Sequence, residues 1–163
     1  MKSKNPIIFV MGVSGSGKST IGKLLAEELS LEFYDGDDYH PEVNVKKMAD
    51  GNPLDDNDRQ GWLERLNVLA IENTKNGAVI ACSALKTKYR TILQNGIDKK
   101  LNFVYLKGSF EEIMARLELR QNHFMPPELL HSQFNTLEVP EDAITVSIMH
   151  TPKEIVFKII TAL

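Results

Sequence analysis

The sequence predicts an α/β fold in which a parallel sheet of five strands is covered by helices on both sides. Short apolar segments alternate with segments whose apolar residues recur at every third and fourth position, the patterns of buried strands and amphipathic helices. A glycine-rich turn joins the first expected strand to the first expected helix. Strands that alternate with helices are typical of parallel sheets, because each helix returns the chain to the same edge.

The expected elements follow one another along the whole chain. The first strand, Ile7-Ile8-Phe9-Val10-Met11, is apolar and rich in β-branched residues. The expected strands span residues 7–11, 31–34, 77–83, 103–106 and 143–149. The expected helices span residues 21–29, 41–51, 58–75, 86–93, 110–117, 127–137 and 155–163. The strand at 77–83 is apolar throughout, which indicates burial on both faces.

The turn after the first strand carries the clearest motif. It fits G-x-x-x-x-G-K-[ST], the pattern of a phosphate-binding loop between a strand and a helix. We expect the following residues to bind a nucleotide: Gly12, Val13, Ser14, Gly15, Ser16, Gly17, Lys18, Ser19 and Thr20. Glycines allow the main-chain amides to turn inward around an anion, and the helix directs its positive end at the same anion.

Two side chains of this loop predict specific chemistry. Lys18 would place a positive charge on the β- and γ-phosphates, and the Ser19 hydroxyl would be a magnesium ligand. The alternative is a glycine-rich turn that binds nothing. The strand before the motif and the amphipathic helix after it favour the phosphate-binding interpretation, because the motif requires this context.

Composition bounds the class of protein. The chain has 163 residues, 42% apolar and 25% charged, which is typical of one globular domain spanning residues 1–163. A net charge of −3 gives no electrostatic reason to expect a nucleic-acid or membrane partner. No apolar run approaches a membrane span, and the residues before the first strand are too few for a signal peptide, so we expect a cytoplasmic enzyme. Cys82 is the single cysteine, and its apolar surroundings favour a buried core residue over a reactive thiol.

Asp35 and Asp37 flank a glycine at the end of the second expected strand. If strand geometry continues through them, their side chains point the same way. One carboxylate could then hold magnesium through water while the other accepts a proton from an attacking hydroxyl. The alternative is a solvated acidic turn. We favour the functional interpretation because phosphoryl transfer needs a carboxylate near the phosphate loop.

Arg116 and Arg120 lie four residues apart on one helix, just before an irregular segment at about 121–126. Cations next to a mobile lid could close over transferring phosphates and neutralise charge in the transition state. Such residues are also favourable at any helix C-terminus. The pattern break that follows them favours the lid.

Other polar side chains fall in the segments around the expected sheet edge. Arg59 could bind a substrate carboxylate, although a surface salt bridge to its acidic neighbours explains it as well. His40 and His123 lie in segments already expected to function, but single histidines are often structural or exposed. Ser83 follows the third strand and would lie on the same edge as the phosphate loop.

Together these residues resemble the gluconate kinase family of small P-loop sugar-acid kinases. The matching segments occur in the same order over nearly the whole chain. Together they are much more specific to this family than the phosphate loop alone. The matching residues are residues 12–19, Asp35-Gly36-Asp37, His40-Pro41, Asn44, Lys47-Met48, Gly51, Pro53-Leu54, Asp58-Arg59, Trp62-Leu63, Cys82-Ser83-Ala84-Leu85-Lys86, Tyr89-Arg90, Tyr105-Leu106-Lys107-Gly108, Arg120, His123-Phe124-Met125, Gln133-Phe134, Leu137-Glu138 and Pro140.

The resemblance implies transfer of the γ-phosphoryl group of ATP, with Mg²⁺, to the 6-hydroxyl of D-gluconate. It also implies a nucleoside-monophosphate-kinase-like fold with a five-stranded parallel core, a lid, a substrate cap at about 38–62 and often a homodimer. The roles implied are catalysis by Lys18, Asp37 and Arg120, metal binding near Ser19 and Asp35, nucleotide contact by Arg116, and substrate binding by Asp37, His40, Arg59, Ser83 and His123.

The chain departs from the family pattern at three positions. Gly61 stands where proline is common, Asn122 where glycine is common, and Ser147 where an acidic residue is common. The first two fall in the cap and the lid, so they bear on rate and affinity more than on the type of reaction.

Three other functions compete with this one. A related kinase for shikimate or a nucleotide is disfavoured, because the chain lacks the further arginines expected around a second nucleotide. A guanine-nucleotide switch finds support only in Asp58-Arg59-Gln60-Gly61, a loose D-x-x-G match, and no Asn-Lys-x-Asp or Thr-Lys-x-Asp sequence occurs. Nucleotide binding without turnover is not favoured, since Lys18, Ser19, Asp37 and Arg120 are all present.

Overall fold

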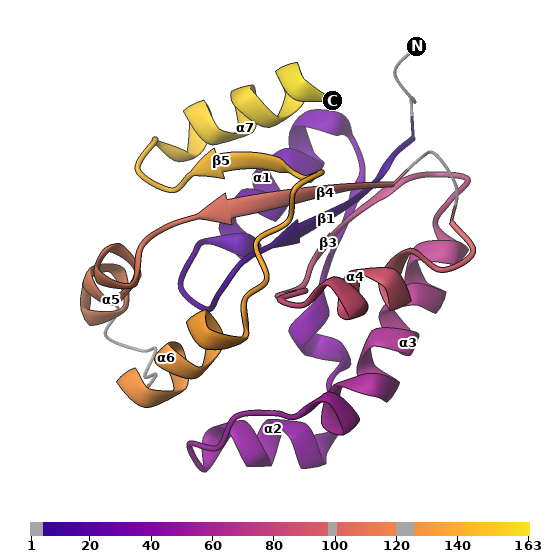
Figure 1. Cartoon of the computed structure of the whole chain (residues 1–163). Helices are drawn as coiled ribbons and strands as arrows, with labels where there is room; N and C mark the ends of the chain where they lie inside the picture. Colours follow the sequence, from indigo (N-terminus) through magenta and orange to yellow (C-terminus); the bar gives the residue numbers. More distant parts are fainter. Residues whose placement is uncertain (1–4, 98–100, 120–125) are drawn as a thin grey trace.

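The computed structural model describes residues 5–97, 101–119 and 126–163 and contains one sheet of five parallel strands (Figure 1). The strands are β1 (Ile7–Met11), β2 (Glu32–Asp35), β3 (Ala78–Ala81), β4 (Leu101–Lys107) and β5 (Ile144–Ser147). The helices are α1 (Lys18–Leu29), the short 3₁₀ helix η1 (Gly36–Tyr39), α2 (Glu42–Ala49), α3 (Asp56–Glu72), α4 (Thr87–Gln94), α5 (Phe110–Leu119), α6 (Pro127–Thr136) and α7 (Pro152–Ala162). The predicted fold class is confirmed.

Apart from η1, which was not predicted, the differences from prediction lie at the ends of elements. Helix α3 begins two residues earlier than predicted. The Asp55 carboxylate accepts the Asp58 main-chain N–H, and the Asp58 carboxylate accepts the Asp55 main-chain N–H. This capping box satisfies amides that the first helical turn leaves without partners. Helix α3 also ends at Glu72 instead of Lys75, and β4 is longer than the four residues expected.

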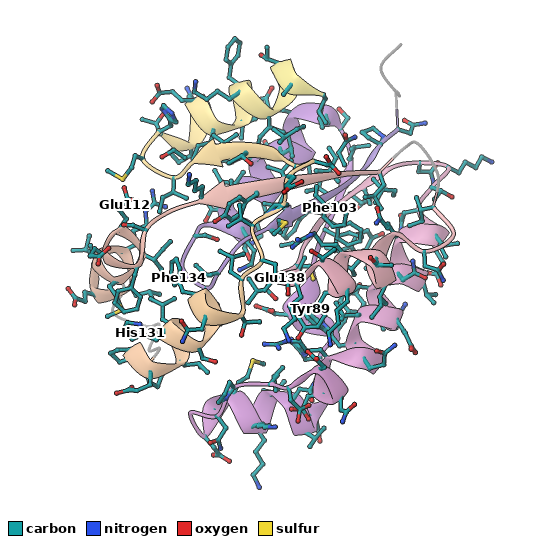
Figure 2. All side chains as sticks on the ribbon, in the orientation of Figure 1. Tyr89, Phe103, Glu112, His131, Phe134 and Glu138 are labelled. Carbon is teal, nitrogen blue, oxygen red and sulfur yellow. The ribbon has the colours of Figure 1, made fainter. Side chains whose placement is uncertain are left out.

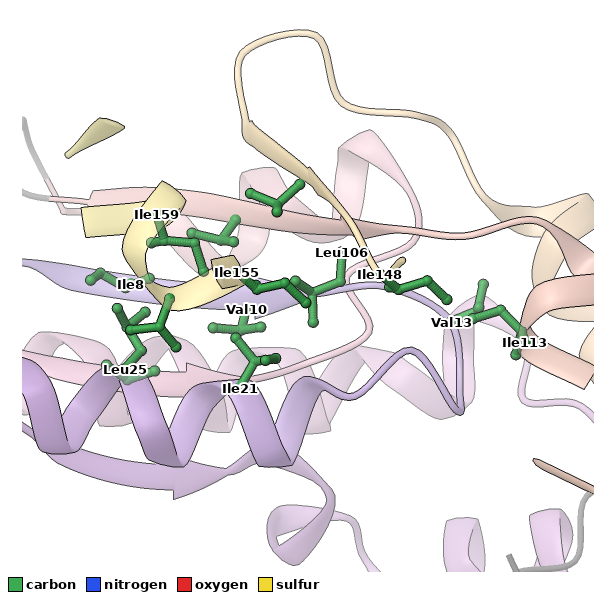
Figure 3. Packing of buried hydrophobic residues seen from close by; sticks show 14 of the residues in the cluster. Ile8, Val10, Val13, Ile21, Leu25, Leu106, Ile113, Ile148, Ile155 and Ile159 are labelled. Carbon is green, nitrogen blue, oxygen red and sulfur yellow. The ribbon is translucent and has the colours of Figure 1, made fainter. Parts of the chain in front are cut away.

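Two layers of helices cover the sheet. Alternate residues of β1 face opposite sides, and all five are fully buried. Ile8 and Val10 pack against α1 and α7, whose Leu25 and Ile155 belong to the same cluster (Figure 3). Phe9 and the other odd-numbered residues of β1 pack against α3 and α4 on the opposite face. Burial of a large apolar side chain contributes roughly 1.5–3 kcal/mol, so β1 is the most strongly anchored strand.

The strand order β2–β3–β1–β4–β5 decides where a ligand can bind. Strand β1 lies between β3 and β4. Strands β2 and β3 therefore lie on one side of β1, and β4 and β5 lie on the other, so the strand order reverses at β1. In such sheets the crevice for ligands opens at the carboxyl ends of the strands. Asp35 ends β2, Ser83 follows β3 and the phosphate loop follows β1, so all three lie along this edge, as predicted.

The expected cap at 38–62 contains the end of η1, helix α2 and the first part of α3. In Figure 1, α2 lies at the bottom, away from the sheet, with α5 and α6 above it on the left. Of the expected lid at 121–126, only Pro126 belongs to the described residues. Within the part of the chain that the structure describes, no helix is both long and apolar enough to cross a membrane.

Candidate functional site

The phosphate loop has a backbone conformation that depends on glycine. Gly15 and Gly17 have φ angles of 83° and 94°, in a region that other residues rarely adopt. Gly17 is also the N-cap of α1, and the described residues provide no side-chain cap and no acidic residue in the first turn of that helix. Helices α3 and α7, in contrast, each begin with a complete capping box. The first amides of α1 are therefore left for a bound anion.

Lys18 lies over its own loop. Its Nζ donates to the carbonyl oxygens of Gly12 at 3.0 Å and Val13 at 3.1 Å. The Val13 side chain is buried in the core, which anchors the loop from below. Ser16 Oγ is buried and has no hydrogen-bond partner among the described residues. Thr20 is exposed in the first turn of α1.

Ser19 and Asp35 place two side-chain oxygens beside the loop. The Ser19 hydroxyl donates to Asp35 Oδ2 at 2.7 Å. Magnesium is commonly held by one or two protein oxygens while phosphates and waters complete its coordination, so this pair fits it. Among residues 5–97, 101–119 and 126–163, no three His, Cys, Asp or Glu side chains gather into a larger metal-binding group.

Asp35 and Asp37 do not share a strand face, which corrects the geometry expected from sequence. Strand β2 ends at Asp35, and residues Gly36–Tyr39 form the 3₁₀ helix η1. Asp35 caps η1, because its Oδ1 accepts the main-chain N–H of Asp37 at 3.0 Å. The tighter turn separates the two carboxylates: Asp35 bonds to Ser19, whereas Asp37 lines a pocket next to Lys18.

Ser83 is placed by the turn that follows β3. Its carbonyl oxygen accepts the Gly12 main-chain N–H at 3.3 Å, which ties the turn to the phosphate loop. The next residue, Ala84, has a φ of 47°, a left-handed conformation that is unfavourable for alanine. Arg90 stabilises it by donating to the Ala84 carbonyl oxygen at 2.7 Å and to the Glu138 carbonyl oxygen at 2.9 Å.

A pocket of about 400 Å³ lies beside the phosphate loop, and we call it the central pocket. Its walls come from the loop, η1, α2, α3, the turn after β3, and α6. The predicted residues that line it are Lys18, Asp37, His40, Arg59 and Ser83. Apolar residues of α2 and α6 close the remaining sides. Ser14 and Gln133, which are 119 positions apart in sequence, are thus brought to one cavity.

His40 is held firmly at the wall of this pocket. Its ring stacks on Trp62 with centroids 3.9 Å apart and an interplanar angle of 17°. Trp62 Nε1 donates to the Gly36 carbonyl oxygen at 2.8 Å, which fixes the indole in turn. Burial, and secondly the positive charge of Arg59, lower the pKa of His40 to about 4. His40 is therefore neutral at neutral pH.

Arg59 is held by α4 and not by its acidic neighbours. Its Nη1 donates to Tyr89 Oη at 2.9 Å, and its guanidinium lies over the Tyr89 ring. Tyr89 belongs to α4 and is labelled in Figure 2. The Tyr89 hydroxyl donates in turn to Asp56. Asp58, the adjacent acid, pairs with Lys47 at 2.6 Å. This arrangement gives the pocket a positioned guanidinium.

Arg116 approaches the phosphate loop from α5. Its guanidinium donates to the Ile148 carbonyl oxygen, and Nη1 would lie 3.7 Å from a Cβ built on Gly17. The cation therefore lies beside the N-terminus of α1. Arg120 and His123 fall outside the described residues.

Three residues in or around the pocket had no role in the sequence analysis. They are Asn44, Tyr89 and Gln133. Gln133 joins α6 to the phosphate loop: its Oε1 accepts the Ser14 main-chain N–H at 2.7 Å, and its Nε2 donates to Ser14 Oγ at 3.0 Å. All three lie within the sequence blocks that carry the family resemblance, and this was the signal that could have found them.

Cys82 is buried, as predicted, and burial raises the pKa of its thiol to about 12. A thiol with so high a pKa is unreactive at neutral pH.

The loop, the parallel sheet and the carboxylates at its edge define a small kinase of the P-loop class. A family model described as shikimate kinase matches residues 14–161. The fold is also similar to that of a shikimate kinase from Aquifex aeolicus, with a TM-score of 0.67 and 19% identity over 95% of this chain and 94% of that one. A likeness at this identity concerns the fold alone.

Closer relatives narrow the class. A probable gluconokinase from Mus musculus is 48% identical over 96% of this chain and 97% of its own length, and the thermoresistant gluconokinase of Escherichia coli is 46% identical over 82% and 77%. A crystal structure of a gluconokinase from Sinorhizobium meliloti is 38% identical with a TM-score of 0.89, covering 97% of this chain and 90% of that one. The chain belongs to the gluconokinase family.

Proposed function

We propose that the protein transfers the γ-phosphoryl group of ATP to the 6-hydroxyl of D-gluconate, giving 6-phospho-D-gluconate and ADP. The observation that carries the proposal is the central pocket, in which Asp37, His40 and Arg59 face a phosphate loop. The cavity joins a site for the phosphoryl donor to polar side chains suited to a polyol acid. The named activity of the gluconokinase relatives supports the same substrate.

The donor half of the site is the phosphate loop with its neighbours. Main-chain amides of the loop and the first turn of α1 bind the nucleotide phosphates, and Lys18 adds charge at the β- and γ-phosphates. Ser19 and Asp35 would hold a magnesium ion, which would neutralise phosphate charge when bound. Arg116 stabilises the phosphates from the side of α5.

The acceptor half holds the sugar acid. Arg59 pairs with the carboxylate, because a guanidinium donates two parallel bonds to such a group. His40 and Ser83 bond hydroxyl oxygens. Asp37 accepts the hydrogen bond of the attacking hydroxyl and takes up its proton late in the transfer. The hydroxyl oxygen bonds to the γ-phosphorus as the bond to the bridging oxygen of ADP breaks. Since the transition state is loose, orientation of the hydroxyl contributes more than early proton removal.

The lid residues and the assembly remain part of the proposal. We expect Arg120 to serve the transferring phosphate and His123 the sugar acid. We also expect a cytoplasmic homodimer without a nucleic-acid partner. Sedimentation of the purified protein measures the oligomeric state directly.

ADP release with a panel of acceptors tests the proposal. We expect turnover with D-gluconate and none with shikimate or nucleoside monophosphates. The Lys18→Ala variant, purified in the same way, shows whether a contaminating kinase contributes. Turnover with another acceptor and none with gluconate would overturn the proposal.

A shikimate-type kinase is the second candidate, because the matching family model carries that description. The panel separates the two, since each acceptor is measured with the same preparation. Turnover with shikimate alone favours the second candidate.

A further inference from the structure

We propose that Asn44 is a positioning residue that holds the His40 ring in the tautomer with its proton on Nε2. His40 then offers the central pocket a fixed hydrogen-bond donor for an oxygen of the sugar acid. The identity of this acid rests on the proposed function, whereas the tautomer follows from contacts within the chain.

The orientation of the Asn44 amide is determined by its surroundings. Asn44 is 2% exposed, and its Nδ2 lies 2.8 Å from the main-chain carbonyl oxygen of Asp58. A carbonyl oxygen only accepts hydrogen bonds, so the nitrogen of the amide must face it. The opposite orientation would place two oxygens against each other in a buried position, which is costly.

The same nitrogen also contacts His40. Asn44 Nδ2 lies 3.3 Å from His40 Nδ1. An amide nitrogen has two protons and does not accept, so its second N–H donates to the ring. His40 Nδ1 must therefore present a lone pair. A ring with one proton then carries it on Nε2.

Two helices, α2 and α3, hold this arrangement. Asn44 is fixed at the start of α2, because its main-chain N–H donates to the Pro41 carbonyl oxygen at 2.9 Å. The Asp58 carbonyl belongs to α3, and the Trp62 ring of the same helix stacks on His40. The ring can neither tilt away from the indole nor turn over without breaking the bond to Asn44.

The charge state of the ring agrees with this geometry. Burial and the nearby Arg59 lower the pKa of His40 to about 4, so the ring carries a single proton at neutral pH. Of the other side chains in the pocket, Lys18 and Arg59 also donate, whereas Asp37 accepts. A fixed donor at His40 therefore selects a substrate oxygen at its position, and a site built in this way rejects molecules that lack the group.

Nitrogen NMR of the histidine rings tests the tautomer without any ligand. We expect the His40 spectrum at neutral pH to show a protonated Nε2 and an unprotonated Nδ1, with the signal assigned from a His40→Gln variant. In Asn44→Asp a carboxylate replaces the amide and can only accept, so we expect a proton on Nδ1. Asn52→Asp makes the same change at an exposed position after α2 and should leave the spectrum unaltered.

Kinetics test the consequence for the substrate. We expect Asn44→Asp to raise the KM for gluconate about tenfold, and to leave the KM for ATP within about twofold, since one hydrogen bond to the acceptor is lost. If the role of Asn44 were purely structural, Asn44→Asp would instead weaken the binding of both substrates or would lower stability alone. Asn52→Asp should match the unsubstituted protein in both constants.

The outcomes separate the two proposals. A proton on His40 Nδ1 in the unsubstituted protein, or equal losses for ATP and gluconate in Asn44→Asp, would overturn the role of Asn44. A proton on Nε2 without gluconate turnover would support the tautomer and overturn the proposed function. The spectrum of the unsubstituted protein decides the tautomer even if Asn44→Asp does not fold.

Discussion

The donor and acceptor halves of the site use different chemical groups of the protein. The donor half consists mainly of main-chain groups: the amides of the phosphate loop and the uncapped N-terminus of α1. The acceptor half consists of side chains held by other side chains, such as Arg59 by Tyr89 and His40 by Asn44 and Trp62. Backbone geometry depends on a few consecutive residues, whereas a side-chain network depends on several distant elements. Substitutions should therefore affect the halves differently.

The largest effect should come from Lys18→Ala. The loop keeps its amides, but the charge at the β- and γ-phosphates is lost. We expect turnover to fall on the order of a hundredfold or more, with the fold retained. The exposed Lys23→Ala on the same helix is the control for loss of a lysine. ADP release measures both, and full activity of Lys18→Ala would refute its role.

Asp37→Asn should have an effect of similar size in the acceptor half. The amide keeps the shape of the carboxylate but is a much weaker acceptor for the hydroxyl proton. We expect a loss of turnover on the order of a hundredfold or more. Asp38→Asn, next to it on η1 and also exposed, is the matched control. An equal loss in both variants would show that the helix, and not Asp37, is responsible.

Tyr89→Phe tests whether the acceptor half depends on indirect contacts. The change removes the hydroxyl that accepts from Arg59 and donates to Asp56. We expect the KM for gluconate to rise roughly threefold to tenfold, and that for ATP to stay constant. Tyr34→Phe removes a hydroxyl bonded to Asn73, away from the pocket. A parallel rise in the KM for ATP would contradict the division into halves.

His40 should make stability depend on pH. Because its pKa is lowered from 6.5 to about 4, the unfolded chain binds a proton that the folded chain does not between these values. The free energy of unfolding therefore decreases as pH falls through this window. Urea unfolding at pH 7 and 4.5 should show a loss on the order of 2 kcal/mol more than in His40→Gln. Identical losses would show that His40 titrates normally.

Gly61→Ala should have the smallest effect, and a favourable one. Gly61 lies inside α3, and a Cβ built on it meets nothing within 4 Å. Alanine should raise the free energy of unfolding by roughly 0.5–1 kcal/mol. Gly36→Ala is the contrasting variant, because its Cβ would lie 2.3 Å from the Ala81 carbonyl oxygen. Thermal unfolding measures both, and destabilisation by Gly61→Ala would contradict the geometry.

The sequence predicted the strand, loop and helix that form the donor half. Consecutive residues determine the loop, and the strand and helix around it follow from local apolar patterns. The prediction failed where one residue changes the local geometry: Asp35 caps a 3₁₀ helix through its own side chain, so the strand does not reach Asp37. Local competition between a side chain and the ladder of a strand is not visible in an alternating pattern.

The acceptor half was predicted as a set of residues but not as a network. His40, Arg59 and Ser83 were expected at the site, yet nothing in their spacing indicated that Asn44 and Tyr89 hold two of them. These contacts join α2 to α3 and α3 to α4, and the packing of helices against each other determines them. A resemblance identifies such residues without explaining what they do.

The bond between Gln133 and Ser14 has a thermodynamic consequence for the whole site. Gln133 Oε1 accepts a hydrogen bond from the Ser14 main-chain N–H, one of the groups that we propose to bind phosphate. A phosphate oxygen that accepts this N–H must displace the glutamine. Phosphate binding is then less favourable by the free energy of that hydrogen bond, about 0.5–1.5 kcal/mol. By linkage, any ligand in the central pocket that draws Gln133 to itself strengthens phosphate binding by the same factor. The two substrates would then promote each other's binding through one side chain of α6.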